Sequence, residues 1–115
     1  MKKIIILVFL NCLVFINNTF SEEVLKIREG NIDAKIEIII YESLTCGFCA
    51  NFHNEIYPKL KKEFIDEGLV SIEFRNFPLD LAALNASKLA HCENNGSSDF
   101  LHTLYKNQET WNKGN

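Results

Sequence analysis

The run Ala34-Lys-Ile-Glu-Ile-Ile-Ile-Tyr41 is followed after four residues by Cys46-Gly47-Phe48-Cys49. Its first part is rich in β-branched residues and ends in the polar loop 42–45, which is typical of a buried strand. From Cys49 onward, apolar residues recur at intervals of three and four, which predicts a helix. The cysteine pair therefore lies where a strand is followed by a helix.

The predicted helix covers 46–67 and ends at Gly68. Pro58 should kink it, because proline removes one intrahelical hydrogen bond. A second buried strand is predicted at 69–75, so strands 34–41 and 69–75 with the helix between them form a βαβ unit with parallel strands. The helix stripe expected to face the core consists of Cys49, Phe52, Ile56, Leu60 and Phe64.

Residues 80–112 are predicted to be helical. The first helix should end at the turn 94–96, and the polar run 97–99 offers N-caps for a second helix. We expect the packing residues to be Ala82, Ala86, Leu89 and Ala90 in the first helix and Phe100, Leu101, Leu104, Tyr105 and Trp111 after it.

The chain opens with Met1-Lys2-Lys3, an apolar run 4–16 and a polar exit, the layout of a secretory signal peptide. The run is shorter than the roughly 20 apolar residues of a membrane span. We expect residues 1–21 to be removed and 22–115 to form one small exported domain, with an uncleaved anchor or a lipoprotein at Cys12 as alternatives. The basic residues are scattered among acids, which disfavours nucleic-acid binding.

Three cysteines remain after position 21, namely Cys46, Cys49 and Cys92, which suggests one redox-active pair and one single thiol. At the start of a helix, free N–H groups and the helix dipole stabilise a thiolate. We therefore expect Cys46 to be the nucleophile and Cys49, one turn further on, to resolve a mixed disulfide. Gly47 and Phe48 should tune the redox potential.

The segment from Tyr41 through Cys46-Gly-Phe-Cys49 to His53 resembles the active-site segment of DsbA-like thiol:disulfide oxidoreductases. The resemblance continues through 74–79, 86–92 and 104–111. It implies a thioredoxin-like fold with a helical insertion, no cofactor, and action on thiols of secreted or periplasmic proteins. It also implies a DsbB-type membrane oxidase as partner. Whether the site oxidises, reduces or isomerises is left open.

The chain departs from this family at its end. Members continue into a C-terminal ββα half with a cis-proline opposite the dithiol, and neither Pro58 nor Pro78 matches that proline. We therefore expect a partial domain with an exposed apolar face, marginal stability and weak activity.

Two further departures lie near the dithiol. Ile40 stands six residues before Cys46, where thioredoxin and many DsbA proteins carry a buried acid, and Glu42 is expected to be solvated in its loop. The dipeptide Gly47-Phe48 lacks the histidine of strongly oxidising members.

Several alternative interpretations remain at this point. The pair could be a structural disulfide, or the chain could be an inactive remnant or a thiol-binding module without catalysis. His53 is expected to be partly exposed, and Cys92 to be a buried apolar side chain, with a regulatory role as its alternative. A zinc site would need two more ligands, from among Cys92, His91, His53 and His102.

Overall fold

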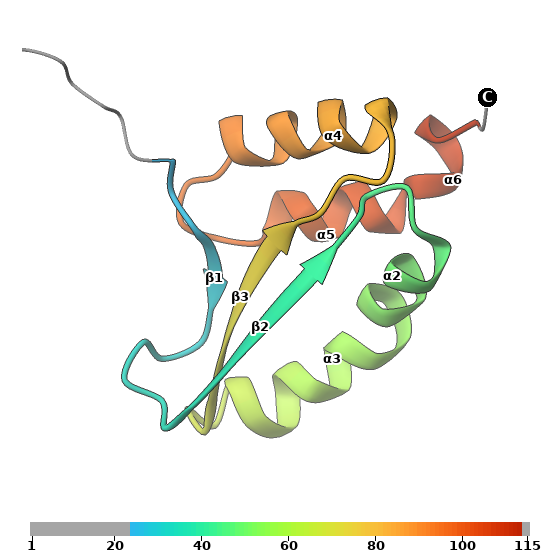
Figure 1. Ribbon diagram of the computed structural model, residues 1–115. Helices are drawn as coiled ribbons and strands as arrows, with labels where there is room; N and C mark the ends of the chain where they lie inside the picture. The colour runs from blue at the N-terminus through green and yellow to red at the C-terminus, as the bar shows by residue number, and fades with distance from the viewer. Residues whose placement is uncertain (1–23, 114–115) are drawn as a thin grey trace, which may run out of the picture.

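A three-stranded sheet forms the frame of the protein. The structure, a computed structural model, describes residues 24–113, so the predicted signal peptide 1–21 lies outside the described residues. The strands are β1 (Ile27–Glu29), β2 (Ile36–Glu42) and β3 (Val70–Asn76), in the order β1-β3-β2 (Figure 1). Strands β2 and β3 are parallel, as the βαβ pattern predicts, with Ile38 opposite Ile72. The short antiparallel strand β1 was not predicted.

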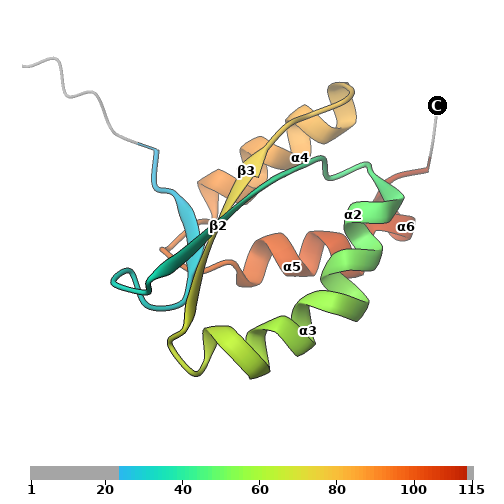
Figure 2. The same cartoon turned by 60° about the horizontal axis from the view of Figure 1, so that its bottom comes forward.

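One long helical segment follows β2, in four parts: α2 (Gly47–Asn51), η1 (Phe52–Ile56), α3 (Tyr57–Leu60) and η2 (Lys61–Ile65). The parts η1 and η2 are π-helical, with hydrogen bonds five residues apart, such as Asp66 N–H to Lys61 O at 2.9 Å. Pro58 lies at the junction of η1 and α3, where it has no N–H to donate to the preceding turn. The segment changes direction between α2 and α3 (Figure 2), the kink that the sequence predicts.

The π-helical turns change which side chains face the core. Each holds an extra residue per turn, so the 3.6-residue period used for the prediction loses phase. The prediction that Ile56 and Phe64 face the core is wrong, since they are 56% and 42% exposed. The buried residues of the segment are Ala50, His53, Tyr57 and Ile65.

Three helices follow β3: α4 (Leu81–Cys92), α5 (Asp99–Lys106) and α6 (Gln108–Trp111). The Asp80 carboxylate caps α4 by accepting from Ala83 N–H at 2.7 Å. Ala82 and Leu89 are exposed, contrary to the prediction, and the buried face of α4 consists of Ala83, Ala86, Ser87 and Ala90. No helix between residues 24 and 113 combines the length and apolar character needed to cross a bilayer.

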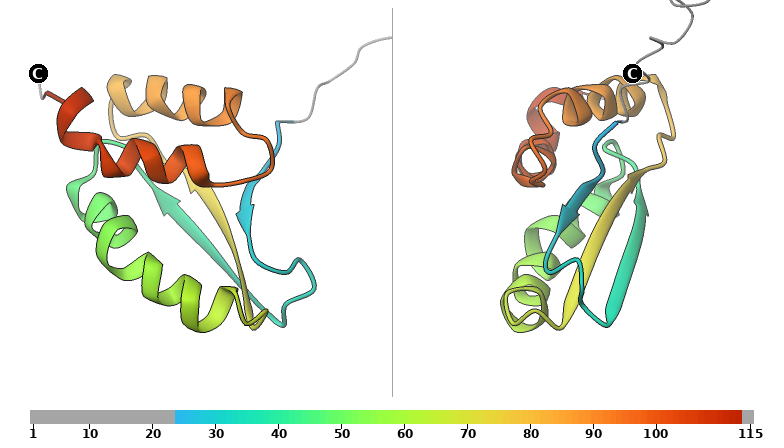
Figure 3. Two further views of the ribbon diagram at one scale, coloured as in Figure 1. Left: turned by 180° about the vertical axis from the view of Figure 1, so that it is seen from behind. Right: turned by 90° about the vertical axis from the view of Figure 1, so that its left-hand side faces the viewer.

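The core lies between one face of the sheet and the helices. The segment 47–65 and α5 lie on the same side of the sheet (Figure 3), where Phe74 contacts the rings of Tyr57 and His102. On the opposite face Ile39 and Tyr41 are exposed, and Glu73 and Arg75 of β3 lie opposite them.

A candidate dithiol site at the start of α2

Cys46 is the N-cap residue of α2. Its backbone is extended, with φ −77° and ψ 118°, and its sulfur accepts a hydrogen bond from Cys49 N–H at 3.3 Å. Cys46 N–H in turn donates to Ser43 O at 3.0 Å. The strand, the tight loop and the helix start therefore place a sulfur atom where backbone N–H groups have no partner within the helix.

The two thiols have different acidities. Hydrogen bonding from the Cys49 thiol, and then from the backbone N–H groups of Cys49 and Phe48, lowers the pKa of Cys46. Burial above all, together with the neighbouring Cys46, raises the pKa of Cys49 to about 11. Both cysteines are free and partly exposed. Cys46 is therefore the more acidic thiol of the pair, and Cys49 stays protonated at neutral pH.

Gly47 and Phe48 line the open side of the dithiol. Phe48 is 88% exposed, and a Cβ placed on Gly47 would meet no atom within 4 Å. Beside them a pocket of about 620 Å³ reaches from the start of α2 to Tyr105 and Gln108. The two residues between the cysteines therefore border open space on the surface of the protein.

The loop before Cys46 is fixed from distant parts of the chain. Gln108 Nε2 donates to Leu44 O at 2.7 Å and to Cys46 O at 3.1 Å. Thr45 Oγ1 donates to the Asp80 carboxylate at 2.7 Å. The helices after β3 therefore hold the dithiol in place, a role that the sequence analysis did not assign to Gln108.

Glu42 is a buried carboxylate behind the dithiol. It is the last residue of β2, is 3% exposed, and bonds through Oε2 to His53 Nε2 at 2.7 Å. The prediction that Glu42 is solvated is wrong, because the strand extends one residue further than expected and turns this side chain toward the helices. Ile40 packs against the core, so the buried acid lies four residues before Cys46.

His53 is buried in the same cluster, not partly exposed as predicted. Its Nδ1 lies 2.7 Å from His102 Nδ1, and its ring stacks on Tyr105 with centroids 4.0 Å apart. Both polar partners of His53, Glu42 and His102, come from other elements. Burial of this imidazole is therefore compensated by hydrogen bonds.

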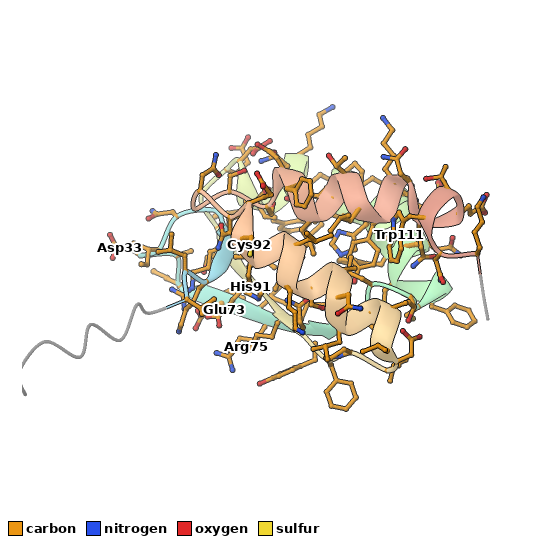
Figure 4. The ribbon with its side chains drawn as sticks, turned by 90° about the horizontal axis from the view of Figure 1, so that it is seen from above. Asp33, Glu73, Arg75, His91, Cys92 and Trp111 are labelled. Atoms are coloured by element: carbon orange, nitrogen blue, oxygen red, sulfur yellow. The ribbon has the colours of Figure 1, made fainter. Side chains whose placement is uncertain are left out.

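Cys92 lies away from the dithiol. It is exposed at the end of α4, so the prediction that it is buried is wrong. In Figure 4, Cys92 and His91 lie far from Trp111, whose helix α6 contacts the active-site loop. Within residues 24–113, no three His, Cys, Asp or Glu side chains are grouped as metal ligands.

A Cys-x-x-Cys pair at the start of a helix, after the first strand of a parallel βαβ unit, defines a thioredoxin-fold dithiol protein. A family model described as thioredoxin matches residues 22–115, and the chain belongs to this family. The predicted fold class, a thioredoxin-like βαβ unit followed by a helical insertion, is confirmed.

The chain is similar to proteins named as disulfide oxidoreductases and as DsbA proteins. "Putative protein-disulfide oxidoreductase" of Rickettsia bellii is 36% identical over 88 residues, which cover 75% of this chain and 34% of that protein. The crystal structure of Wolbachia pipientis alpha-DsbA1 matches with a TM-score of 0.69 and 36% identity, over 76% of this chain and 45% of that one. BdbD from Bacillus subtilis matches with a TM-score of 0.62 and 26% identity, over 70% and 46%.

These matches confirm the predicted relationship to DsbA-like oxidoreductases. The chain spans about a third of the length of the curated relative from Rickettsia and less than half of the two crystal structures.

Proposed function

We propose that this chain is an exported thiol:disulfide oxidoreductase that promotes disulfide formation or exchange in secreted proteins through Cys46 and Cys49. The observation that carries the proposal is the asymmetry of the two thiols. Cys46 caps α2, and hydrogen bonding lowers its pKa. The pKa of Cys49 is raised to about 11, mainly by burial. Stepwise exchange needs this division into a nucleophile and a protected resolving thiol.

The exchange begins when a substrate thiolate attacks the sulfur of Cys46 in the oxidised pair. The Cys46–Cys49 bond breaks, a mixed disulfide forms at Cys46, and Cys49 leaves as a thiolate that takes up a proton. A second substrate thiolate then attacks the substrate sulfur, and Cys46 leaves as a thiolate stabilised by the N–H groups of α2. The substrate gains a disulfide, and the protein gains the two electrons as a dithiol.

The surroundings of the dithiol suit a protein substrate. Exposed Phe48 offers an aromatic contact, and Gly47 leaves room for a substrate backbone. Both residues, next to the reactive sulfur, would also tune the potential. Within this proposal the protein acts in the periplasm on the thiols of secreted proteins, and a DsbB-type membrane oxidase restores its disulfide.

Trapping tests the division of roles. The full chain carrying Cys49→Ala, expressed with its own N-terminus, should accumulate dithiothreitol-sensitive mixed disulfides on non-reducing gels. Adding Cys46→Ala should abolish these adducts, and adding Cys92→Ala should leave them. An absence of adducts, or adducts that depend on Cys92, contradicts the proposal.

The reduction potential decides the direction of the reaction. A lowered pKa of Cys46 stabilises the reduced form and so favours oxidation of substrates. Equilibration with glutathione should give a potential nearer to about −120 mV than to about −270 mV, the values of a strong oxidant and of thioredoxin. A value at the thioredoxin end would assign the site to reduction instead.

A further inference from the structure

We propose that the pocket beside Gly47 and Phe48 binds the backbone of an extended substrate segment next to the substrate cysteine that reacts with Cys46. The proposal rests on the proposed function, since it names the kind of substrate that the dithiol meets. The binding groups are side-chain amides on α2, η1 and α6. The substrate class is unfolded polypeptide, because its backbone N–H and C=O groups are not already paired in secondary structure.

The pocket lies next to the dithiol loop. Gly47 and Phe48 line one side of it, and residues 105–110, where α5 ends and α6 begins, line the other. Helices α2 and α6 lie close together in Figure 2. The volume of about 620 Å³ falls within the range of roughly 300–1,000 Å³ that is usual for ligand pockets. A chain attached to Cys46 therefore has this pocket beside it.

Gln108 presents a fixed hydrogen-bond acceptor at the pocket. The residue is 8% exposed, and its Nε2 donates to Leu44 O at 2.7 Å and to Cys46 O at 3.1 Å. Backbone carbonyl groups only accept hydrogen bonds, so the amide of Gln108 cannot be turned over. Its Oε1 has no partner among residues 24–113 and is not one of their fully enclosed polar atoms. This oxygen is therefore a free acceptor held in one orientation by a buried side chain.

Two asparagines supply further amides. Asn51 ends α2 and Asn54 lies in η1, and both are exposed and line the pocket. Each side-chain amide carries a donor and an acceptor. This combination matches the N–H and C=O groups that an extended chain presents along its length. Together with Gln108, the asparagines can therefore pair with a substrate backbone on both sides of the pocket.

The remaining lining residues favour backbone recognition over recognition of a charged side chain. The charged residues are one of each sign, Lys106 and Glu109, so the pocket selects neither acidic nor basic segments. Besides Gln108, the buried lining residues are Ala50 and Tyr105. Substrates of different sequence should therefore bind, as an enzyme acting on many unfolded chains requires.

Disulfide exchange at Cys46 measures this binding. A short peptide of alanine and serine with one central cysteine is attached, through its activated disulfide, to the full chain carrying Cys12→Ser, Cys49→Ala and Cys92→Ser. Mercaptoethanol thiolate then attacks the sulfur of Cys46, and the peptide leaves as a thiolate that takes up a proton. Because Cys46 is in a mixed disulfide before and after, the equilibrium constant of exchange reports the non-covalent binding of the peptide.

Asn51→Ala and Asn54→Ala should each shift the exchange toward released peptide by about 2- to 10-fold, the effect of losing one hydrogen bond. The matched control is Glu55→Gln, because Glu55 follows Asn54, is exposed and lies outside the pocket. This variant should leave the constant unchanged. Propanethiol, which has no peptide groups, should exchange equally in every variant.

N-methylation of the peptide identifies the group that Gln108 binds. A methyl group on a backbone nitrogen removes one N–H and leaves the side chains unchanged. Methylation should favour release by about 2- to 10-fold at one or two positions on one side of the cysteine, and have little effect elsewhere. In Gln108→Ala, which lacks the acceptor, this penalty should disappear. The asparagine variants and the methylated peptides test the pocket even if Gln108→Ala does not fold.

Backbone binding is overturned if Asn51→Ala and Asn54→Ala give the same exchange constant as the parent chain. An equal effect of methylation at every position also overturns it. A constant that depends on the side chains of the peptide, and not on its N–H groups, would assign the pocket to side-chain recognition instead. An absence of cellular adducts in Cys49→Ala contradicts the proposed function and leaves these constants unaffected, so the two failures are distinguishable.

Discussion

Gln108 Nε2 donates a hydrogen bond to the backbone carbonyl of Cys46 at 3.1 Å. The same nitrogen donates to Leu44 O at 2.7 Å, and Gln108 is buried. One side chain from α6 therefore satisfies two carbonyl groups in the loop that carries the reactive cysteine. The helical region after β3 is thus a structural part of the dithiol site.

Gln108→Ala should lower the free energy of unfolding by about 1–3 kcal/mol, because two buried carbonyl groups lose their donor. Urea denaturation followed by circular dichroism measures the change. Glu109→Ala, one residue further on and exposed, is the matched control and should change stability by less than about 0.5 kcal/mol. Equal effects of the two substitutions would show that the hydrogen bonds to the loop are unimportant.

The thiols of Cys46 and Cys49 should ionise in well-separated pH ranges. Hydrogen bonding from Cys49 lowers the pKa of Cys46, and burial raises that of Cys49 to about 11. The thiolate absorbance of the reduced protein carrying Cys12→Ser and Cys92→Ser should rise below the ordinary thiol pKa of about 8.5 and again only near pH 11. Cys46→Ser should remove the first rise. A single rise near pH 8.5 would contradict the assigned roles.

Cys49 should also make the reduced protein sensitive to alkali. Its folded pKa lies above its unfolded value, so its contribution to stability is complete below about pH 8.5 and disappears as pH rises through about 11. The melting temperature of the reduced protein should fall over this window. Cys49→Ser should remove that part of the fall, and an unchanged slope in this variant would contradict the prediction.

The ionised carboxylate of Glu73 should contribute to the stability of the protein, and this contribution should be lost at acidic pH. Hydrogen bonds first from Arg75 and then from Arg28 lower its pKa to about 2, so its contribution is complete above the unfolded value of about 4.3 and is lost as pH falls toward 2. Melting temperatures measured over this range should fall less steeply in Glu73→Gln. Glu67→Gln, at an exposed position, should keep the wild-type slope.

Replacing Gly30 or Gly47 by alanine should change the stability of the protein in opposite directions. Gly30 has φ +90°, and a Cβ there would lie 2.6 Å from Val70 O. Gly30→Ala should therefore destabilise the protein by at least about 1–3 kcal/mol in urea denaturation. Gly47, at the start of α2 with open space around it, should tolerate alanine with a gain of up to about 1 kcal/mol. The opposite order would contradict the geometry of the Gly30 turn.

Local patterns were enough to predict the frame of the site. Short stretches of sequence are enough to recognise three of its features: the β-branched run before Cys46, the spacing of the two cysteines and the second strand. Parallel pairing of β2 and β3 follows from their connection through a helix. The sequence therefore predicts the position of Cys46 at a helix start, which the structure shows.

The buried polar cluster could not be predicted in this way. Glu42 and His53 are 11 residues apart, and His53 and His102 are 49 apart. A carboxylate next to a loop is usually solvated, and only the combined packing of β2, η1 and α5 supplies its partner. The sequence holds one signal, an acid and two histidines around the dithiol, but their spacing alone does not indicate contact.

The π-helical turns also affect tolerance to changes in chain length. A π-helical turn differs from an α-helical turn by one residue, so deleting one residue from η1 would allow regular α-helical hydrogen bonds there. The same deletion would rotate every later side chain of the helix by about 100°, turning Tyr57 and Ile65 out of the core. Substitutions on the exposed side of this helix should therefore be tolerated far better than any single-residue deletion, even one that makes the helix more regular.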